Sequence, residues 1–260
     1  MFNSFGEYAK YYDLLYQDKN YAGEASFISR LLDRYLKKTT RHELLDLACG
    51  TGQHAMELAR IGYVVEGSDL SADMVKVARD NVKEAGLNIK FYNESFQNSN
   101  RIDKKYDAVI AMFSAINYLT DYVDLAKTLQ NIQGLLREGG VFIFDFWNGN
   151  AVIKNYSPVR TKRIKDGEFE LLRITNTCLD PLSQIATLNF DFMLIRSGTI
   201  VKEFTEVHRV RYFFPQEMLD FLAANGYEIL YRSPFFRDDE PLTSEDWNVT
   251  YVATPINTLS

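Results

Sequence analysis

The chain has 260 residues, of which 46% are hydrophobic and 25% charged, with a formal net charge of −6 at pH 7. These values are typical of a globular protein with one large domain, with or without an insertion. The acidic balance argues against a nucleic-acid protein, which needs a basic face. No apolar run approaches the roughly 20 residues that cross a bilayer. The N-terminal residues lack the pattern of a signal peptide, so we expect a cytoplasmic protein that contacts neither membrane nor nucleic acid.

The two cysteines, Cys49 and Cys178, form neither a disulfide framework nor a metal-binding spacing, so we expect no metal. Tyrosines are concentrated near the N-terminus and precede a stretch with apolar residues at helical spacing. We interpret residues 1–40 as an aromatic and helical cap. The tyrosines in it can also be read as a stripe that only packs the helices.

From residue 43 to residue 143 the pattern alternates between apolar strands and amphipathic helices. Ser71 predicts a helix start and Gly86 a helix end. Strands alternating with helices predict a parallel sheet covered on both faces, with ligands at the carboxyl ends of the strands. We expect strands at 44–48, 63–67, 89–92, 106–112 and 141–146, and helices at 53–60, 71–85 and 122–136.

After residue 155 four strands follow without a helix between them, which predicts an antiparallel meander. They are expected at 158–165, 168–179, 184–195 and 200–213. A helix at 215–224 and strands at 227–231 and 247–253 then resume the α/β pattern. We therefore predict an α/β core over 41–154 and 214–260, with an antiparallel β insertion over 155–213 on the substrate side.

A glycine turn lies between the first strand and the first helix of the core. Gly50 and Gly52 permit a tight turn and close approach of a ligand to the backbone, and the helix that follows directs amides to the same space. Asp69 ends the next strand, where a carboxylate can accept both hydroxyls of a ribose. The same order of features also fits a dinucleotide, because Gly50, Gly52 and Ala55 satisfy the relaxed fingerprint.

Asp46 separates these two interpretations. A carboxylate four residues before Gly50 would repel the pyrophosphate of a dinucleotide, whereas it would attract the ammonium and sulfonium of S-adenosylmethionine (SAM). Asp46 can also be read as a cap for local amides. We favour SAM as cofactor and methyl transfer as activity. An NAD(P)-dependent oxidoreductase and a non-catalytic SAM-binding protein stay as alternatives.

Two segments resemble motifs of the class I SAM-dependent methyltransferases. LLDLACGTG (44–52) resembles their first motif, and VVEGSDLS (64–71) followed by Met74 resembles their second. The resemblance implies a doubly wound, Rossmann-like sheet of seven strands, mostly parallel, with the last strand antiparallel. It also implies that the turn holds the methionine part of SAM, Asp69 the ribose, and the loop 93–96 the adenine. The cofactor residues expected are Asp46, Ala48, Cys49, Gly50, Thr51, Gly52, Asp69, Leu70, Met74, Glu94, Ser95 and Met112.

A narrower resemblance concerns the acceptor. YYDLLY (11–16), the loop after the fourth strand and the late meander are similar to bacterial N,N-dimethyltransferases that act on nucleotide-linked aminosugars. This implies that the N-terminal segment closes over the cofactor, that the insertion shapes the sugar site, and that Tyr12 touches the substrate. The expected acceptor is the amine of such a sugar, and an anionic acceptor is one option. The substrate residues expected are Tyr12, Tyr16, Asn117, Tyr118, Trp147 and Arg211.

Methyl transfer demands little acid–base chemistry of the protein, since aligned reactants supply much of the acceleration. A neutral amine needs no base, whereas a hydroxyl usually does. His208 is the best candidate for a base, with Tyr12 as a second catalytic candidate, although His208 can also be a packed strand residue. The sequence leaves open the acceptor, the number of methyl groups added and the oligomeric state, for which a homodimer is one option.

Overall fold

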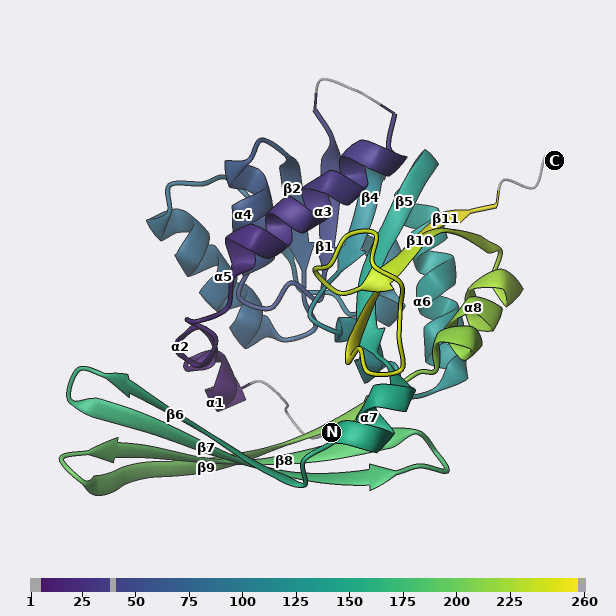
Figure 1. The fold of residues 1–260 in the computed structure, drawn as a ribbon. Coiled ribbons are helices and arrows are strands. Elements are labelled where there is room, and N and C mark those ends of the chain that lie inside the picture. The colour runs from purple at the N-terminus through teal and green to yellow at the C-terminus, as the bar shows by residue number, and fades with distance from the viewer. Residues whose placement is uncertain (1–5, 38–40, 257–260) are drawn as a thin grey trace.

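The computed structural model describes residues 6–37 and 41–256. Figure 1 shows a large sheet with helices on both faces, and a separate four-stranded sheet beneath it. Two short N-terminal helices, α1 (Gly6–Ala9) and α2 (Tyr12–Leu15), lie between the two sheets. None of the described helices is long and apolar enough to cross a membrane.

The large sheet has seven strands in the order β10-β11-β5-β4-β1-β2-β3. β1 pairs in parallel with both β2 and β4, whereas β11 runs antiparallel to both β5 and β10. The doubly wound, mostly parallel sheet with an antiparallel last strand is therefore confirmed. The strands are β1 (Glu43–Leu47), β2 (Val64–Ser68), β3 (Lys90–Tyr92), β4 (Tyr106–Ala111), β5 (Leu136–Trp147), β10 (Tyr227–Pro234) and β11 (Asn248–Pro255).

Helices cover both faces of this sheet because each buries an apolar stripe against it. α3 (Tyr21–Tyr35), α4 (Gln53–Arg60) and α5 (Ala72–Glu84) enclose one core. α6 (Tyr122–Leu135) and α8 (Pro215–Ala224) enclose the other. Ser71 caps α5 as predicted, since its side chain accepts a hydrogen bond from the amide of Met74.

The predicted meander is present as the four-stranded antiparallel sheet β6-β7-β8-β9. One face of it packs apolar side chains against α1 and α2 and forms a third core. This places the N-terminal residues and the meander, about 150 residues apart in sequence, on the same side of the large sheet (Figure 1). The strands are β6 (Val159–Asp166), β7 (Phe169–Asp180), β8 (Ile185–Arg196) and β9 (Thr199–Arg211).

Three short elements differ from the sequence prediction, and two strand boundaries differ from it by three residues or more: β5 begins earlier, and β10 ends at Pro234 rather than at residue 231. A helix α7 (Gly149–Asn155) follows β5, capped by the side chain of Asn148, and two 3-10 helices occupy Phe96–Arg101 and Ala115–Tyr118. β5 begins at Leu136 rather than residue 141, because the chain becomes extended there and Leu136 pairs with Tyr106. Elements this short carry too few apolar positions to give a recognisable period.

Candidate functional site

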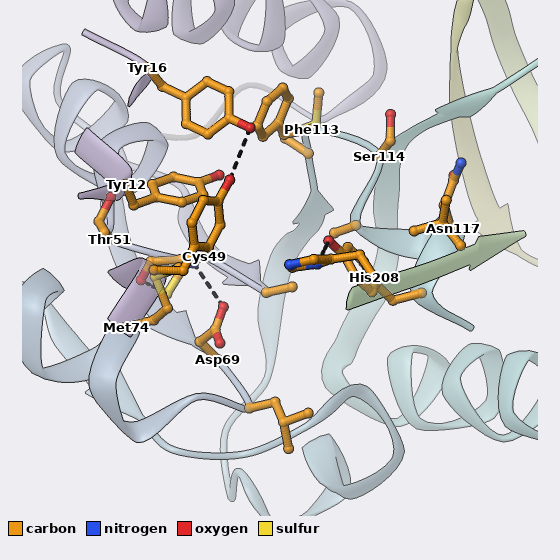
Figure 2. Close-up of a pocket in the computed structure, with 18 of the residues that line it drawn as sticks. Tyr12, Tyr16, Cys49, Thr51, Asp69, Met74, Phe113, Ser114, Asn117 and His208 are labelled. Carbon is orange, nitrogen blue, oxygen red and sulfur yellow. Dashed lines mark hydrogen bonds between the residues drawn. The ribbon is translucent and has the colours of Figure 1, made fainter. Parts of the chain in front are cut away.

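A cavity of about 580 Å³ lies between the carboxyl edge of the large sheet, the N-terminal helices and the four-stranded sheet. Figure 2 shows the labelled residues on its walls. Cys49, Thr51, Asp69 and Met74 lie on one side, His208 and Asn117 on the opposite side, and Tyr16 and Phe113 between them. The cavity therefore brings together the glycine turn and the β insertion.

The turn after β1 has a backbone that depends on glycine. Gly50 and Gly52 have positive φ angles of 55° and 80°, and Ala48 shares this conformation with φ 56°. A Cβ on Gly52 would lie 3.0 Å from the ring of Phe91, so this position also needs glycine for space. Gly52 serves as N-cap of α4 and does not line the cavity, unlike Gly50.

Asp69 supports the turn from the end of β2. Its carboxylate accepts hydrogen bonds from the amide of Gly50 at 2.9 Å and the amide of Ser71 at 2.8 Å. Burial raises the pKa of Asp69, and the two amide hydrogen bonds oppose this rise. The carboxylate is thus fixed in orientation at the cavity wall, at the position expected of a ribose ligand.

Asp46 is a buried carboxyl group, and one of its oxygen atoms has no hydrogen-bond partner among the described residues. Its side chain lines the cavity, and among the described residues its Oδ2 atom has no hydrogen-bond partner. Burial first, and then the nearby Asp69 carboxylate, raise the pKa of Asp46 to about 8. A buried acceptor without a partner is costly, and a cationic ligand would satisfy it. The residues present therefore fit the ammonium group of SAM.

The N-terminal segment is tied to this turn by a contact that sequence reasoning missed. The Asp13 carboxylate on α2 accepts the Thr51 hydroxyl at 2.5 Å and the Asn81 side-chain amide at 2.8 Å. Asn81 also donates to the carbonyl of Thr51 at 3.1 Å. The ring of Tyr12 approaches Gly50, since a Cβ there would lie 4.0 Å from Tyr12 Cε1. The contact thus sets one wall of the cavity.

Aromatic side chains make the roof. The Tyr12 and Tyr16 rings lie 4.8 Å apart, and the Tyr16 and Phe113 rings meet edge to face at 5.1 Å (Figure 2). The Tyr8 and Tyr16 hydroxyls lie 3.1 Å apart. Burial raises the pKa values of Tyr8 and Tyr12, so both stay protonated at neutral pH. This roof places aromatic rings and tyrosine hydroxyl groups over the cavity.

His208 is buried in the wall opposite the glycine turn. Its Nδ1 atom lies 2.8 Å from the Tyr118 hydroxyl, and its Nε2 atom lies 3.2 Å from a Glu206 carboxylate oxygen. With an ionised Glu206 and a neutral ring, Nε2 would donate to the carboxylate and Nδ1 would accept from the Tyr118 hydroxyl. Both ring nitrogens are therefore engaged, which favours a positioning role over that of a base. The sequence did not identify Glu206.

The loop after β4 is held by buried polar contacts. Phe113 and Ser114 both have positive φ angles, and Ser114 donates its amide and hydroxyl to the Asp145 carboxylate at 2.9 and 2.8 Å. Asn117 accepts the amide of Trp147 at 3.4 Å. Within the described ranges, its Nδ2 atom is buried and has no hydrogen-bond partner. Asn117 is thus both an anchor of the loop and a donor left for a ligand.

The structure brings almost all residues named from the sequence to one cavity, and leaves Gly52 and Arg211 off its walls. Arg211 pairs with Glu217 at 2.6 Å and donates to Gln184 at 2.9 Å, because its strand face points away from the cavity. Among the described residues, no group of three or more His, Cys, Asp or Glu is arranged to hold a metal. The cavity contains Tyr12, Tyr16, Asp46, Ala48, Cys49, Gly50, Thr51, Asp69, Leu70, Met74, Glu94, Ser95, Met112, Asn117, Tyr118, Trp147 and His208.

Comparison with known proteins identifies the class. Residues 44–140 match the family model of the methyltransferase domain. A dTDP-3-amino-3,6-dideoxy-alpha-D-glucopyranose N,N-dimethyltransferase from Streptomyces fradiae is 26% identical over 228 residues, 86% of this chain and 85% of that enzyme. Bacillus subtilis YqeM is named as a methyltransferase, and its name specifies no methyl acceptor. It is 28% identical over 198 residues, which are 76% of this chain and 78% of YqeM.

The structural comparison agrees with the sequence comparisons. The crystal structure of a SAM-dependent methyltransferase from Clostridium acetobutylicum matches with a TM-score of 0.81 and 23% identity, covering 98% of this chain and 100% of that one. The domain match and the similarity to proteins named as methyltransferases make the chain a SAM-dependent methyltransferase rather than an oxidoreductase or a non-catalytic binding protein, and its seven-stranded fold matches that of the Clostridium acetobutylicum enzyme.

Proposed function

We propose that this methyltransferase acts on the amine of a nucleotide-linked aminosugar. The observation that carries the proposal is the extent of similarity to the Streptomyces fradiae sugar N,N-dimethyltransferase. The match covers 86% of the chain. It therefore includes part of the four-stranded sheet, whether the uncovered residues lie at the N-terminal or at the C-terminal end. The similarity therefore reaches the elements that face the acceptor, beyond the domain that binds the cofactor.

On the cofactor side, we assign the binding of SAM to residues 41–154 and 214–260. SAM supplies, when bound, a methyl group on a positively charged sulfur. The backbone of residues 48–52 would hold its methionine part, with Asp46 at the ammonium and Asp69 at the ribose hydroxyls. Glu94, Ser95 and Met112 line the same cavity and would flank the adenine. Acidic side chains at this end suit a cationic cofactor.

On the acceptor side, we assign the binding of the sugar to the cap (1–40) and the β insertion (155–213). Tyr12, Tyr16, Asn117 and Tyr118 offer hydroxyl and amide groups that match a polyhydroxylated ring, and Trp147 offers a flat apolar surface. A neutral amine attacks without a base, so the chain has only to align it and exclude water. This agrees with the engaged state of both His208 nitrogens.

Mass analysis of products tests the acceptor. The enzyme is incubated with labelled SAM and either a dTDP-3-aminosugar, the matching 3-hydroxy sugar nucleotide, the free aminosugar, or glycine. We expect label on the amine of the sugar nucleotide, with one or two methyl groups. Transfer to the hydroxy sugar or to glycine alone, by protein that binds SAM, would contradict the proposal.

A further inference from the structure

Three cationic side chains from β6 and β7 line the cavity from the inner face of the four-stranded sheet. In the β6–β7 register, Arg160 pairs with Thr175 and Lys162 pairs with Arg173. Alternate residues of a strand point to the same face, and paired residues point the same way. All four side chains line the cavity from the four-stranded sheet, whereas Asp46 and Asp69 line it from the carboxyl edge of the large sheet. The cations of β6 and β7 and these two carboxyl groups thus belong to different walls of the cavity.

The two arginines on this face lack an anionic partner within the described ranges. Arg173 donates to the Tyr16 hydroxyl at 3.3 Å and lies over the Phe190 ring at 5.1 Å. Its Nε atom is buried and has no hydrogen-bond partner in the described part of the chain. No described carboxylate lies within 4 Å of the charged nitrogens of Arg160 or Arg173, whereas Lys162 is held by Asp18 at 2.8 Å.

Arg163 lies on the opposite face of β6 and allows the two faces to be compared. It points away from the cavity, is largely exposed, and pairs with Glu170 at 2.8 Å. Like charges placed side by side on one face of a sheet destabilise it unless something compensates. Burial first, and then Arg173, lower the pKa of Arg160. On the inner face, Arg160 and Arg173 therefore repel each other, whereas on the outer face the charge of Arg163 is compensated by Glu170.

We infer that Arg160 and Arg173 form an anion subsite that binds the diphosphate of the acceptor. Guanidinium groups match phosphate oxygens with two parallel hydrogen bonds, and the Nε–H of Arg173, which has no partner among the described residues, is a donor for them. An anionic acceptor at the wall of β6 and β7 complements a cationic cofactor at the wall of the glycine turn. The inference rests on the proposed function, because it names the part of a nucleotide-linked sugar that these arginines hold.

Calorimetric titration with thymidine diphosphate and with thymidine tests the subsite, in the presence of saturating SAM. The variants are Arg160→Gln and Arg173→Gln, with Arg163→Gln as a matched control from the outer face. We expect each of the first two to weaken thymidine diphosphate binding on the order of tenfold or more. Thymidine binding, SAM binding and the control should be unchanged. Arg160 is the more exposed of the two arginines, so its variant should keep the fold even if that of Arg173 does not.

The outcomes separate this inference from the proposed function. Equal thymidine diphosphate affinities in wild type and in folded Arg160→Gln and Arg173→Gln would overturn the subsite. Loss of diphosphate binding in the variants, with no aminosugar methylated by wild type, would uphold the subsite and refute the amine acceptor. Methylation of the sugar nucleotide with an unchanged KM in both variants would uphold the amine acceptor and refute the subsite.

Discussion

The Asp13 carboxylate on α2 accepts a hydrogen bond from the hydroxyl of Thr51 in the glycine turn at 2.5 Å. Asn81 on α5 reaches the same carboxylate and also the Thr51 carbonyl. One aspartate thus joins the N-terminal segment to the turn and to the helix behind it. Because Tyr12 precedes Asp13 and lines the cavity, we expect the position of the aromatic roof to depend on this junction.

Asp13→Ala should loosen the roof without unfolding the core. Two hydrogen bonds to a charged group are lost, each worth about 1.5–3 kcal/mol, and they connect segments far apart in sequence. We expect faster hydrogen exchange in α1 and α2, and a SAM dissociation constant raised several-fold. Asp80→Ala, an exposed change beside Asn81, is the control. Unaltered exchange in α2 would show that apolar packing alone holds the segment.

Asp69→Ala should weaken SAM binding more than it weakens the fold. The change removes the expected ribose contacts and also the acceptor that holds the Gly50 amide. We expect the SAM dissociation constant to rise at least tenfold, with a modest drop in melting temperature. Titration calorimetry and thermal unfolding measure the two effects, with Asp73→Ala on the exposed side of α5 as control. Unchanged affinity would remove Asp69 from the cofactor site.

Much of the fold could be predicted from sequence because its strands are apolar runs separated by amphipathic helices. The boundaries of β1, α4 and α5 differ from the prediction by one residue or less. The cofactor turn was equally visible, since Gly50, Gly52 and Asp69 follow one another in a short stretch. Helix α7 was missed because it has only seven residues and opens with Gly149, which reads as loop.

The acceptor side was harder to predict because its contacts are long-range. Tyr16 and Arg173 meet across 157 positions, and Tyr118 and His208 across 90, so no local pattern relates them. Arg211 was expected on the substrate side as a cation that could meet an anionic acceptor if its strand face met the cleft. That face points away from the cavity, and Arg211 pairs with Glu217. Arg160 and Lys162 alternate along β6 and so share its inner face, a relation that the sequence prediction did not draw.

Asp46→Asn should stabilise the ligand-free protein increasingly as the pH rises. The folded pKa of Asp46 is about 8, whereas a free aspartate has a pKa of about 3.9. Between these values the folded protein keeps a proton that the unfolded chain releases, so this stabilisation is full below about pH 4 and is lost as the pH rises through 8. Asparagine cannot ionise. The variant should therefore gain up to a few kcal/mol over wild type between pH 5 and 8.

Urea unfolding at pH 5, 6, 7 and 8 measures the difference in the free energy of unfolding between the two proteins. Asp69 is present in both, so its own contribution to the pH dependence largely cancels in this difference. SAM binding gives a second readout. A cationic ligand favours the ionised carboxylate, so wild type should release close to one proton on binding SAM at pH 7, and Asp46→Asn should release none. Calorimetry in two buffers of different ionisation enthalpy detects the proton. Parallel stability curves, together with equal proton release, would place no titrating group at Asp46.

His208→Ala separates a base from a positioning residue. An acceptor amine that binds in its neutral form needs no base, so kcat at saturating substrates should fall less than about tenfold, with a larger rise in KM for the acceptor. A true general base would contribute about 10²–10⁴-fold. Tyr118→Phe removes the hydroxyl that lies 2.8 Å from Nδ1 of His208. It should also lower kcat slightly and raise the KM for the acceptor more strongly. Because His208 is buried, melting temperature and SAM affinity are measured on each variant. A fall in kcat above a hundredfold, in protein that stays folded and binds both substrates, would assign proton abstraction to His208.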